Sequence, residues 1–160
     1  MRRQSMAIAA TIILILALVS VATAADPIIG TWKLNLAKSK FATQRSAPKE
    51  LTEVYREIDG NQIEFTATAI LADGSSYLLK GVWPAQGGIA KVLQGGSPEV
   101  SYVQTLIEPG NWYRTALHDG KQVALIHKTF SKDGRVMIQT HKGMDRQGRP
   151  FEDVLVYDRQ

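Results

Sequence analysis

Turn signals recur at short intervals along most of this chain. Asp-Gly pairs stand at residues 59–60, 73–74, 119–120 and 133–134, with Pro-Gly-Asn at 109–111 and Gln-Gly at 147–148. Asp-Gly tolerates the positive φ angles that tight hairpin turns require. The segments between these turns are rich in β-branched and aromatic residues and too short for a helix of ordinary length. The chain is therefore predicted to be all-β and antiparallel.

Several of these segments alternate between apolar and polar residues, as a strand with one buried face does. Ile63, Phe65, Ala67 and Ala69 share one face, opposite Gln62, Glu64, Thr66 and Thr68. The predicted strands are residues 30–35, 51–58, 62–71, 76–83, 89–93, 99–107, 112–118, 122–130, 135–142 and 151–157.

A long meander of such strands must close on itself or stack into two sheets, because an open sheet leaves its edges unpaired. We predict a closed, up-and-down antiparallel β-barrel of about eight to ten strands. A two-sheet sandwich stays the alternative, since the sequence does not show which strands pair at the seam.

Residues 1–25 differ from the rest of the chain. Arg2 and Arg3 precede an uncharged apolar run at 7–21, and Ala22-Thr23-Ala24 then offers small residues. This pattern is typical of a cleaved secretory signal, whereas a retained anchor needs about 20 apolar residues. We expect residues 26–160 to form one domain, secreted or periplasmic, with no stable membrane span after cleavage.

Charge and cysteine content exclude several classes. The formal net charge is +4. The predicted signal holds two arginines and no acid, so this charge falls to about +2 in the mature chain. The remaining Lys and Arg are scattered among Asp and Glu, which argues against a nucleic-acid partner. With no Cys, the chain has neither disulfides nor thiolate metal sites.

The ends of the predicted barrel resemble a known superfamily. Gly30-Thr31-Trp32-Lys33-Leu34 and Val156-Tyr157-Asp158-Arg159 resemble the first and last strands of the lipocalin and fatty-acid-binding-protein barrels, the calycins. Residues 30–41, 131–135 and 142–150 are similar to a family of small secreted bacterial lipocalin-like proteins without an assigned activity.

The resemblance implies that Trp32 plugs the closed end of the barrel and packs against a basic residue of the last strand, here Arg159. In the fatty-acid-binding branch an Arg two residues before the last-strand Tyr holds the ligand carboxylate. Leu155 stands at that position. The segment 37–49, a predicted surface loop with one helical turn at 35–41, is also short for that branch's lid. Both departures argue against free fatty acid as the ligand.

The predicted function is binding of a small apolar or amphipathic molecule inside the barrel. The candidate ligand-binding residues are Trp32, Arg56, Phe65, Trp112, Arg114, Leu155 and Tyr157. Arg56 shares a face with Val54 and Ile58, and this face is either interior or exposed. If 119–120 is a two-residue turn, Arg114 pairs with Leu125 and Trp112 with His127. Ordinary packing is the alternative for Trp112.

The chain has no recognisable catalytic or nucleotide-binding motif. The chain has no nucleophile elbow, phosphate loop or dinucleotide fingerprint. Glu152 and Asp153 are adjacent, so they point to opposite faces. If 133–134 is a two-residue turn, His127 and His141 also lie on opposite faces and cannot share an ion. We expect no metal and no cofactor.

Three functions stay open: the ligand-binding barrel, an interaction module with a filled core and, less favoured, an enzyme without a recognisable motif. The loop 37–49 is the candidate lid. Gly87-Gly88 and Gly95-Gly96 flank a weak strand, and they mark either a ligand portal or, as such glycines usually do, only turns.

Overall fold

The computed structural model describes residues 25–42, 47–145 and 147–160, so nearly all of the predicted signal 1–25 lies outside the described residues. These residues form ten antiparallel strands and no helix, which confirms the predicted class. The strands are β1 (Gly30–Leu34), β2 (Glu50–Ile58), β3 (Gln62–Ile70), β4 (Ser76–Pro84), β5 (Gly87–Gly95), β6 (Val100–Glu108), β7 (Asn111–His118), β8 (Lys121–Phe130), β9 (Val136–Met144) and β10 (Pro150–Arg159).

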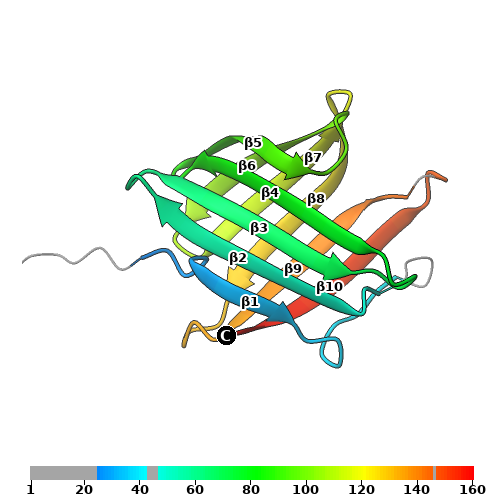
Figure 1. Cartoon of the computed structure of the whole chain (residues 1–160), viewed down its shortest axis with the longest axis horizontal. Coiled ribbons are helices and arrows are strands. Elements are labelled where there is room, and N and C mark those ends of the chain that lie inside the picture. The colour runs from blue at the N-terminus through cyan, green and yellow to red at the C-terminus, as the bar shows by residue number, and fades with distance from the viewer. Residues whose placement is uncertain (1–24, 43–46, 146) are drawn as a thin grey trace, which may run out of the picture.

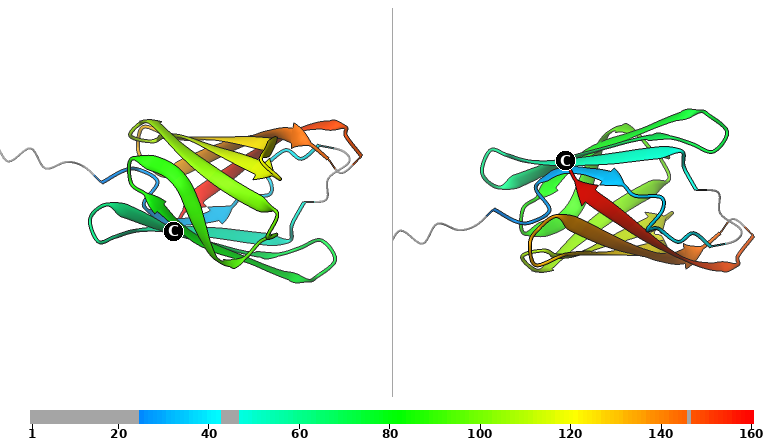
Figure 2. Two further views of the ribbon diagram at one scale, coloured as in Figure 1. Left: turned by 90° about the horizontal axis from the view of Figure 1, so that it is seen from above. Right: turned by 90° about the horizontal axis from the view of Figure 1, so that it is seen from below.

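The strands close into one barrel (Figure 1). Each strand pairs with its neighbours in the chain, and β1 closes the sheet by pairing with β10, where Trp32 faces Arg159 and Leu34 faces Tyr157. Figure 2 shows these first and last strands side by side. The prediction of a closed up-and-down barrel is confirmed, and the two-sheet sandwich is wrong.

Tight turns set the strand register as the sequence indicated. Asp59 and Asp119 have φ angles of 52° and 48°, and each precedes a Gly that also has positive φ. Because the turn after β2 pairs Ile58 with Gln62, Tyr55 lies opposite Phe65. The face of β3 with Ile63, Phe65, Ala67 and Ala69 is buried, as predicted.

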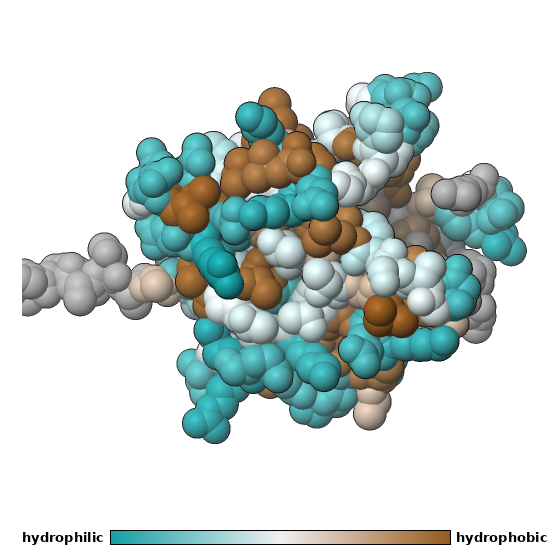
Figure 3. Space-filling view, in the orientation of Figure 1, coloured by the Kyte–Doolittle hydropathy of each residue, from teal (hydrophilic) through white to brown (hydrophobic). Residues whose placement is uncertain are grey.

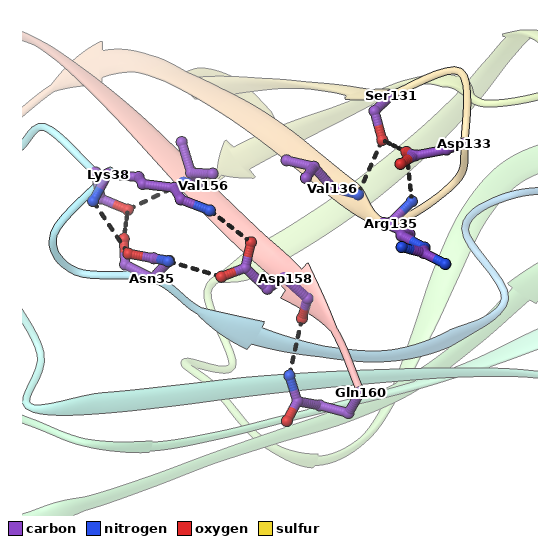
Figure 4. A network of polar contacts seen from close by, with 10 residues as sticks. Asn35, Lys38, Ser131, Asp133, Arg135, Val136, Val156, Asp158 and Gln160 are labelled. Carbon is purple, nitrogen blue, oxygen red and sulfur yellow. Dashed lines mark hydrogen bonds and ion pairs between the residues drawn. The ribbon is translucent and has the colours of Figure 1, made fainter.

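A polar network ties the seam together on the outer surface (Figure 4). Asn35 Nδ2 donates to Asp158 Oδ2 at 2.6 Å, and Lys38 Nζ pairs with Asp158 Oδ1 at 3.1 Å. In the neighbouring turn between β8 and β9, Ser131 Oγ donates to Asp133 Oδ1 at 2.6 Å. The two contacts of Asp158 join the first and last parts of the barrel across the seam, whereas the contact of Ser131 lies within one turn.

One predicted register is wrong by a single residue. Across the β7–β8 hairpin Arg114 faces Ile126 and Trp112 faces Lys128, because a β-bulge shifts the pairing between Ala116 and Leu117. His127 consequently lies outside, where its ring stacks on Tyr113 at 4.3 Å.

Across β8 and β9 the predicted pairing is confirmed. His127 faces Thr140 and Ile126 faces His141. Neighbouring residues on one strand point to opposite faces, so the two histidines lie on opposite sides of the sheet.

The closed end of the barrel is filled with aromatic side chains. Trp32 is fully buried, and the Arg159 guanidinium carbon lies 4.3 Å from the centre of its ring. Arg159 also donates to the backbone oxygens of Gly134, Ile29 and Pro27 at 2.6–2.8 Å. The plug and its basic partner, implied by the resemblance, are confirmed.

The open end has looser connections. Lys40 forms an isolated bridge with Val154, which anchors the start of the loop 37–49 to β10. Residues 43–46 of this loop lie outside the described residues, and the part before them forms a turn and not the expected helical turn.

β5 pairs with β6 only over Gly87–Ala90, so the two strands separate toward the open end near the predicted portal. Ile89, Leu93 and Ile107 of these strands are exposed, and Figure 3 shows apolar patches on an otherwise polar face. Among the described residues no helix is long and apolar enough to cross a membrane.

Candidate functional site

A cavity of about 660 Å³ occupies the open half of the barrel. The loop before β2 and the turn between β3 and β4 form its rim, and strands β2, β3, β4, β6, β7, β8, β9 and β10 provide its walls. Most lining residues are apolar: Phe41, Pro48, Leu51, Phe65, Ala67, Ala69, Leu71, Ala72, Leu79, Ile126 and Leu155. The polar or amphipathic ones are Glu53, Asp73, Tyr77, Tyr102, Arg114, His141 and Asp153.

Side-chain size explains why this half is hollow. Inward positions of β3 carry Phe65 near the middle of the barrel and then Ala67 and Ala69 toward the mouth. Two methyl groups cannot span the interior of a barrel of this size, whereas Trp83 and Trp112 fill the other half, with ring centres 6.4 Å apart. Alternation along the strands therefore directs side chains inward in both halves of the barrel. These side chains are large enough to fill only the closed half.

A buried polar network lies at the inner end of the cavity, between the hollow and the filled halves. Tyr55 Oη donates to Glu53 Oε2 at 2.5 Å, and Gln139 Nε2 donates to the same oxygen at 2.7 Å. Lys128 Nζ donates to Tyr55 Oη and lies 3.8 Å from Glu53 Oε2. Tyr157 Oη reaches Glu53 Oε1 at 3.4 Å. Glu53 thus has partners on four strands, which compensates for its loss of water.

Burial and the neighbouring charges change the proton affinities of this network. Burial alone would raise the pKa of Glu53, but Lys128, Arg114 and the hydrogen bonds from Tyr55 and Gln139 hold it below its ordinary value. Burial and the Glu53 charge raise the pKa of Tyr55 well above its usual range. Burial, followed by repulsion from Arg114, lowers the pKa of Lys128 to about 7, although Glu53 opposes this.

Arg114 is the second buried cation, and its environment differs from that of Lys128. Its guanidinium carbon lies 4.4 Å from the centre of the Phe65 ring and 5.9 Å from that of Tyr102. The side chain is only 8% exposed, yet Nε and Nη2 have no hydrogen-bond partner within the protein. An acceptor group placed in the cavity would satisfy these two donors.

The structure separates the predicted binding residues into three groups. Phe65, Arg114 and Leu155 line the cavity. Trp32, Trp112 and Tyr157 are buried below it, where Trp32 Nε1 donates to Ile28 O at 2.9 Å and Trp112 Nε1 to Asp26 Oδ2 at 3.1 Å.

The structure selects the exposed one of the two faces left open for Arg56, so this candidate does not line the cavity. It does share a face with Val54, but this face is the outer one, because Glu53 and Tyr55 of β2 point inward. Arg56 therefore does not point into the barrel. The charged group that β2 places in the interior is the carboxylate of Glu53.

Glu53, Lys128 and Gln139 were not predicted. Lys and Glu are almost never fully buried without a partner, so their type indicates surface positions. One signal was present: the turn at 59–60 places Glu53 opposite Ala67, on the face already predicted to be buried. The bulge between β7 and β8 prevented the same argument for Lys128.

The mouth of the cavity contains a further buried acid. Asp153 Oδ1 accepts a hydrogen bond from the backbone N–H of Ala42 at 2.8 Å, which fixes the start of the predicted lid to β10. Glu152 points outward to Lys142 at 3.2 Å. The two adjacent acids lie on opposite faces, as predicted. Within the described residues no cluster of three or more His, Asp or Glu is arranged to hold a metal ion.

Comparison with known proteins bears on the fold. No family model matches the chain, and the comparison with curated proteins found no match either. The solved structure of the zebrafish ileal bile acid-binding protein complexed with cholic acid superposes with a TM-score of 0.53. The match covers 84% of this chain and 99% of that chain at 10% identity. This chain has a calycin-like barrel fold. The resemblance found in its first and last strands is confirmed at that level.

Proposed function

We propose that this protein binds a small apolar or amphipathic molecule inside the open half of its barrel. The observation that carries the proposal is the cavity of about 660 Å³, which has mostly apolar walls, with polar groups at its inner end and at its mouth. Small-molecule sites are concave, mostly apolar and of about 300–1,000 Å³, with few polar groups that orient the ligand.

The distribution of polar groups favours an amphipathic ligand over a purely apolar one. Ala67, Ala69 and Leu155 offer only methyl groups along the walls, whereas Glu53 and Arg114 expose charge at the inner end. A molecule with an apolar body and one polar end matches both regions. The bile acid-binding protein with the same type of fold, solved with cholic acid, supports this ligand class.

Saturation binding of a neutral fluorescent probe tests the proposal. We expect phenyl-naphthylamine to bind residues 26–160 one to one, with an increase in probe fluorescence and with competition by a lipid extract. The competing extract then becomes the source from which the ligand is purified. Absence of saturable binding by folded protein would contradict the proposal and favour the module that acts through its surface.

The site of action is part of the proposal. We propose that residues 1–25 are removed and that the barrel works outside the cytoplasm, secreted or in the periplasm. The contacts of Asp26 support this boundary, since its carboxylate accepts from Ile28 N at 2.8 Å and from Trp112 Nε1 at 3.1 Å. Mass spectrometry of the exported protein should give a chain beginning at Asp26, whereas an intact Met1 would contradict cleavage.

A further inference from the structure

Two of the three side-chain nitrogens of Arg114, Nε and Nη2, lack a hydrogen-bond partner, which holds for no other buried cation of the described residues. Arg114 extends from β7 into the barrel, lies against Phe65 and Tyr102, and lines the cavity. A buried donor without an acceptor carries a cost of about 1–3 kcal/mol, and more when the group is charged. The fold therefore keeps two such donors at a position where a ligand would meet them.

The neighbouring carboxylate of Glu53 attracts Arg114, but it does not supply the hydrogen bonds that Nε and Nη2 lack. Glu53 already accepts from Tyr55, Gln139 and Tyr157, and its ion-pair partner is Lys128 at 3.8 Å. Among the described residues no ion pair joins Arg114 to an acid. The inner end of the cavity thus combines a hydrogen-bonded carboxylate with a guanidinium that keeps two unpaired donor nitrogens.

We propose that the ligand carries a monoanionic head group, such as a carboxylate, that binds the Arg114 guanidinium, and that Lys128 takes up a proton as this head group binds. The inference rests on the proposed function, since it assigns a chemistry to the polar end of the same ligand. Leu155 stands where a last-strand Arg would be in fatty-acid-binding proteins, so the anion site proposed here comes from a different strand, β7.

The contacts of Lys128 explain the coupling to protons. Its ammonium faces Tyr55 and Glu53 from β2 and lies 5.7 Å from the centre of the Phe65 ring on β3. Gln139 on β9 and Tyr157 on β10 bind the same Glu53 carboxylate. Within the part of the chain that the structure describes, Arg114 is the only other cation that acts on Lys128, and it repels the charged form.

An anion at Arg114 reverses that repulsion. The pKa of Lys128 is about 7 in the free protein, because of burial first and Arg114 second. A bound anion offsets the positive charge of Arg114 and also attracts the ammonium, so the charged form of Lys128 becomes favoured. Binding near pH 8 then draws a proton from solution, and linkage requires that anion affinity falls as the pH rises above the pKa of free Lys128.

Two matched probes distinguish the contribution of an anionic head group to binding from that of the apolar body. Anilinonaphthalene sulfonate and phenyl-naphthylamine have the same rings, and only the first carries an anion. We expect Arg114→Gln to lower the affinity for the sulfonate probe by about 10- to 100-fold, as loss of a charge-assisted hydrogen bond does. The affinity for the neutral probe should change by less than about threefold. Arg56→Gln, the same substitution on the outer face, should change neither.

Each outcome of this pair has a distinct meaning. If neither probe binds the wild-type protein, the proposed function fails. If both bind but Arg114→Gln weakens them equally or not at all, the anion site is wrong and the binding barrel stands. Arg114→Lys, which keeps the charge, should retain part of the preference for the sulfonate, and binding of the neutral probe reports that each variant is folded.

Isothermal titration calorimetry tests whether the protein takes up a proton when the anion binds. The sulfonate stays ionised at pH 8, so titrations in phosphate and in Tris, which differ in ionisation enthalpy, report protons taken up by the protein. For a group with a pKa near 7 we expect uptake of about 0.5–0.9 proton per bound anion, and none for the neutral probe. Lys128→Met should remove the uptake. Heats that do not depend on the buffer, or uptake that persists in Lys128→Met, would overturn the role of Lys128.

Discussion

The closed and the open halves of this barrel are built from the same strands, yet they bury different things. At the closed end Trp32, Trp83 and Trp112 fill the interior, and Arg159 fastens the plug. In the open half the corresponding inward positions of β3 are Ala67 and Ala69, and a cavity of about 660 Å³ remains. The difference shows that strand alternation decides which residues face inward, whereas side-chain volume decides where the barrel is hollow.

The boundary between the halves is polar. Glu53, Tyr55 and Lys128 form a network that is buried as fully as the tryptophans, although such groups are costly to remove from water. Hydrogen bonds compensate Glu53, and Lys128 responds by a lowered pKa. The closed half therefore supplies stability and the open half supplies space. The boundary supplies the charges that we propose recognise a ligand.

Removal of the plug should have the largest effect. Trp32→Ala deletes a fully buried indole beside Arg159 and Phe130, so we expect a loss of about 3–5 kcal/mol in the free energy of unfolding. Urea denaturation measures it, with Leu36→Ala at the exposed end of the same segment as the control. A loss below about 1 kcal/mol would show that the closed end does not carry the stability assigned to it.

The polar boundary should make stability depend on pH. Above the pKa of Lys128, about 7, the unfolded chain binds a proton that the folded protein lacks, so the free energy of unfolding should rise with pH. The slope approaches about 1.4 kcal/mol per pH unit, or about 2–3 kcal/mol between pH 7.5 and 9.5. Urea denaturation across this range should show the rise in the wild type and a flatter profile in Lys128→Met. Equal slopes would mean that Lys128 is not the titrating group.

Filling the open half should weaken binding at little cost in stability. Ala67→Leu adds volume to the cavity wall, so we expect affinity for phenyl-naphthylamine to fall by about tenfold or more, equivalent to about 1.4 kcal/mol. Thr68→Leu places the same side chain on the outer face of β3 and should leave affinity unchanged. Similar losses in the two variants would place the probe outside the barrel.

Much of the fold was predictable because its signals are local. Asp-Gly turns such as 59–60 and the apolar face from Ile63 to Ala69 define strands within one hairpin, and the end strands indicated the seam between Trp32 and Arg159. The bulge next to Leu117 was not predictable, because no residue type there demands it, and one extra residue shifted every pairing beyond it.

The site was less predictable than the fold. Phe65, Arg114 and Leu155 were identified, since an inward position and a plausible contact are readable from alternation. Glu53 and Lys128 were missed because the burial of each depends on the other, and they lie on β2 and β8, far apart in sequence. Compensation between distant charges is a tertiary property, and residue type alone points the other way.

The position of a bound probe tests the central claim most directly. In an NMR titration with phenyl-naphthylamine, the account predicts the largest shifts at the methyl groups of Ala67, Ala69, Ile126 and Leu155, which line the cavity. The indole N–H signals of Trp32 and Trp112, which donate to Ile28 and Asp26, should stay nearly unchanged. Dominant shifts at these indoles, or on the exposed side chains of β5 and β6, would contradict a filled closed half and a ligand-binding open half.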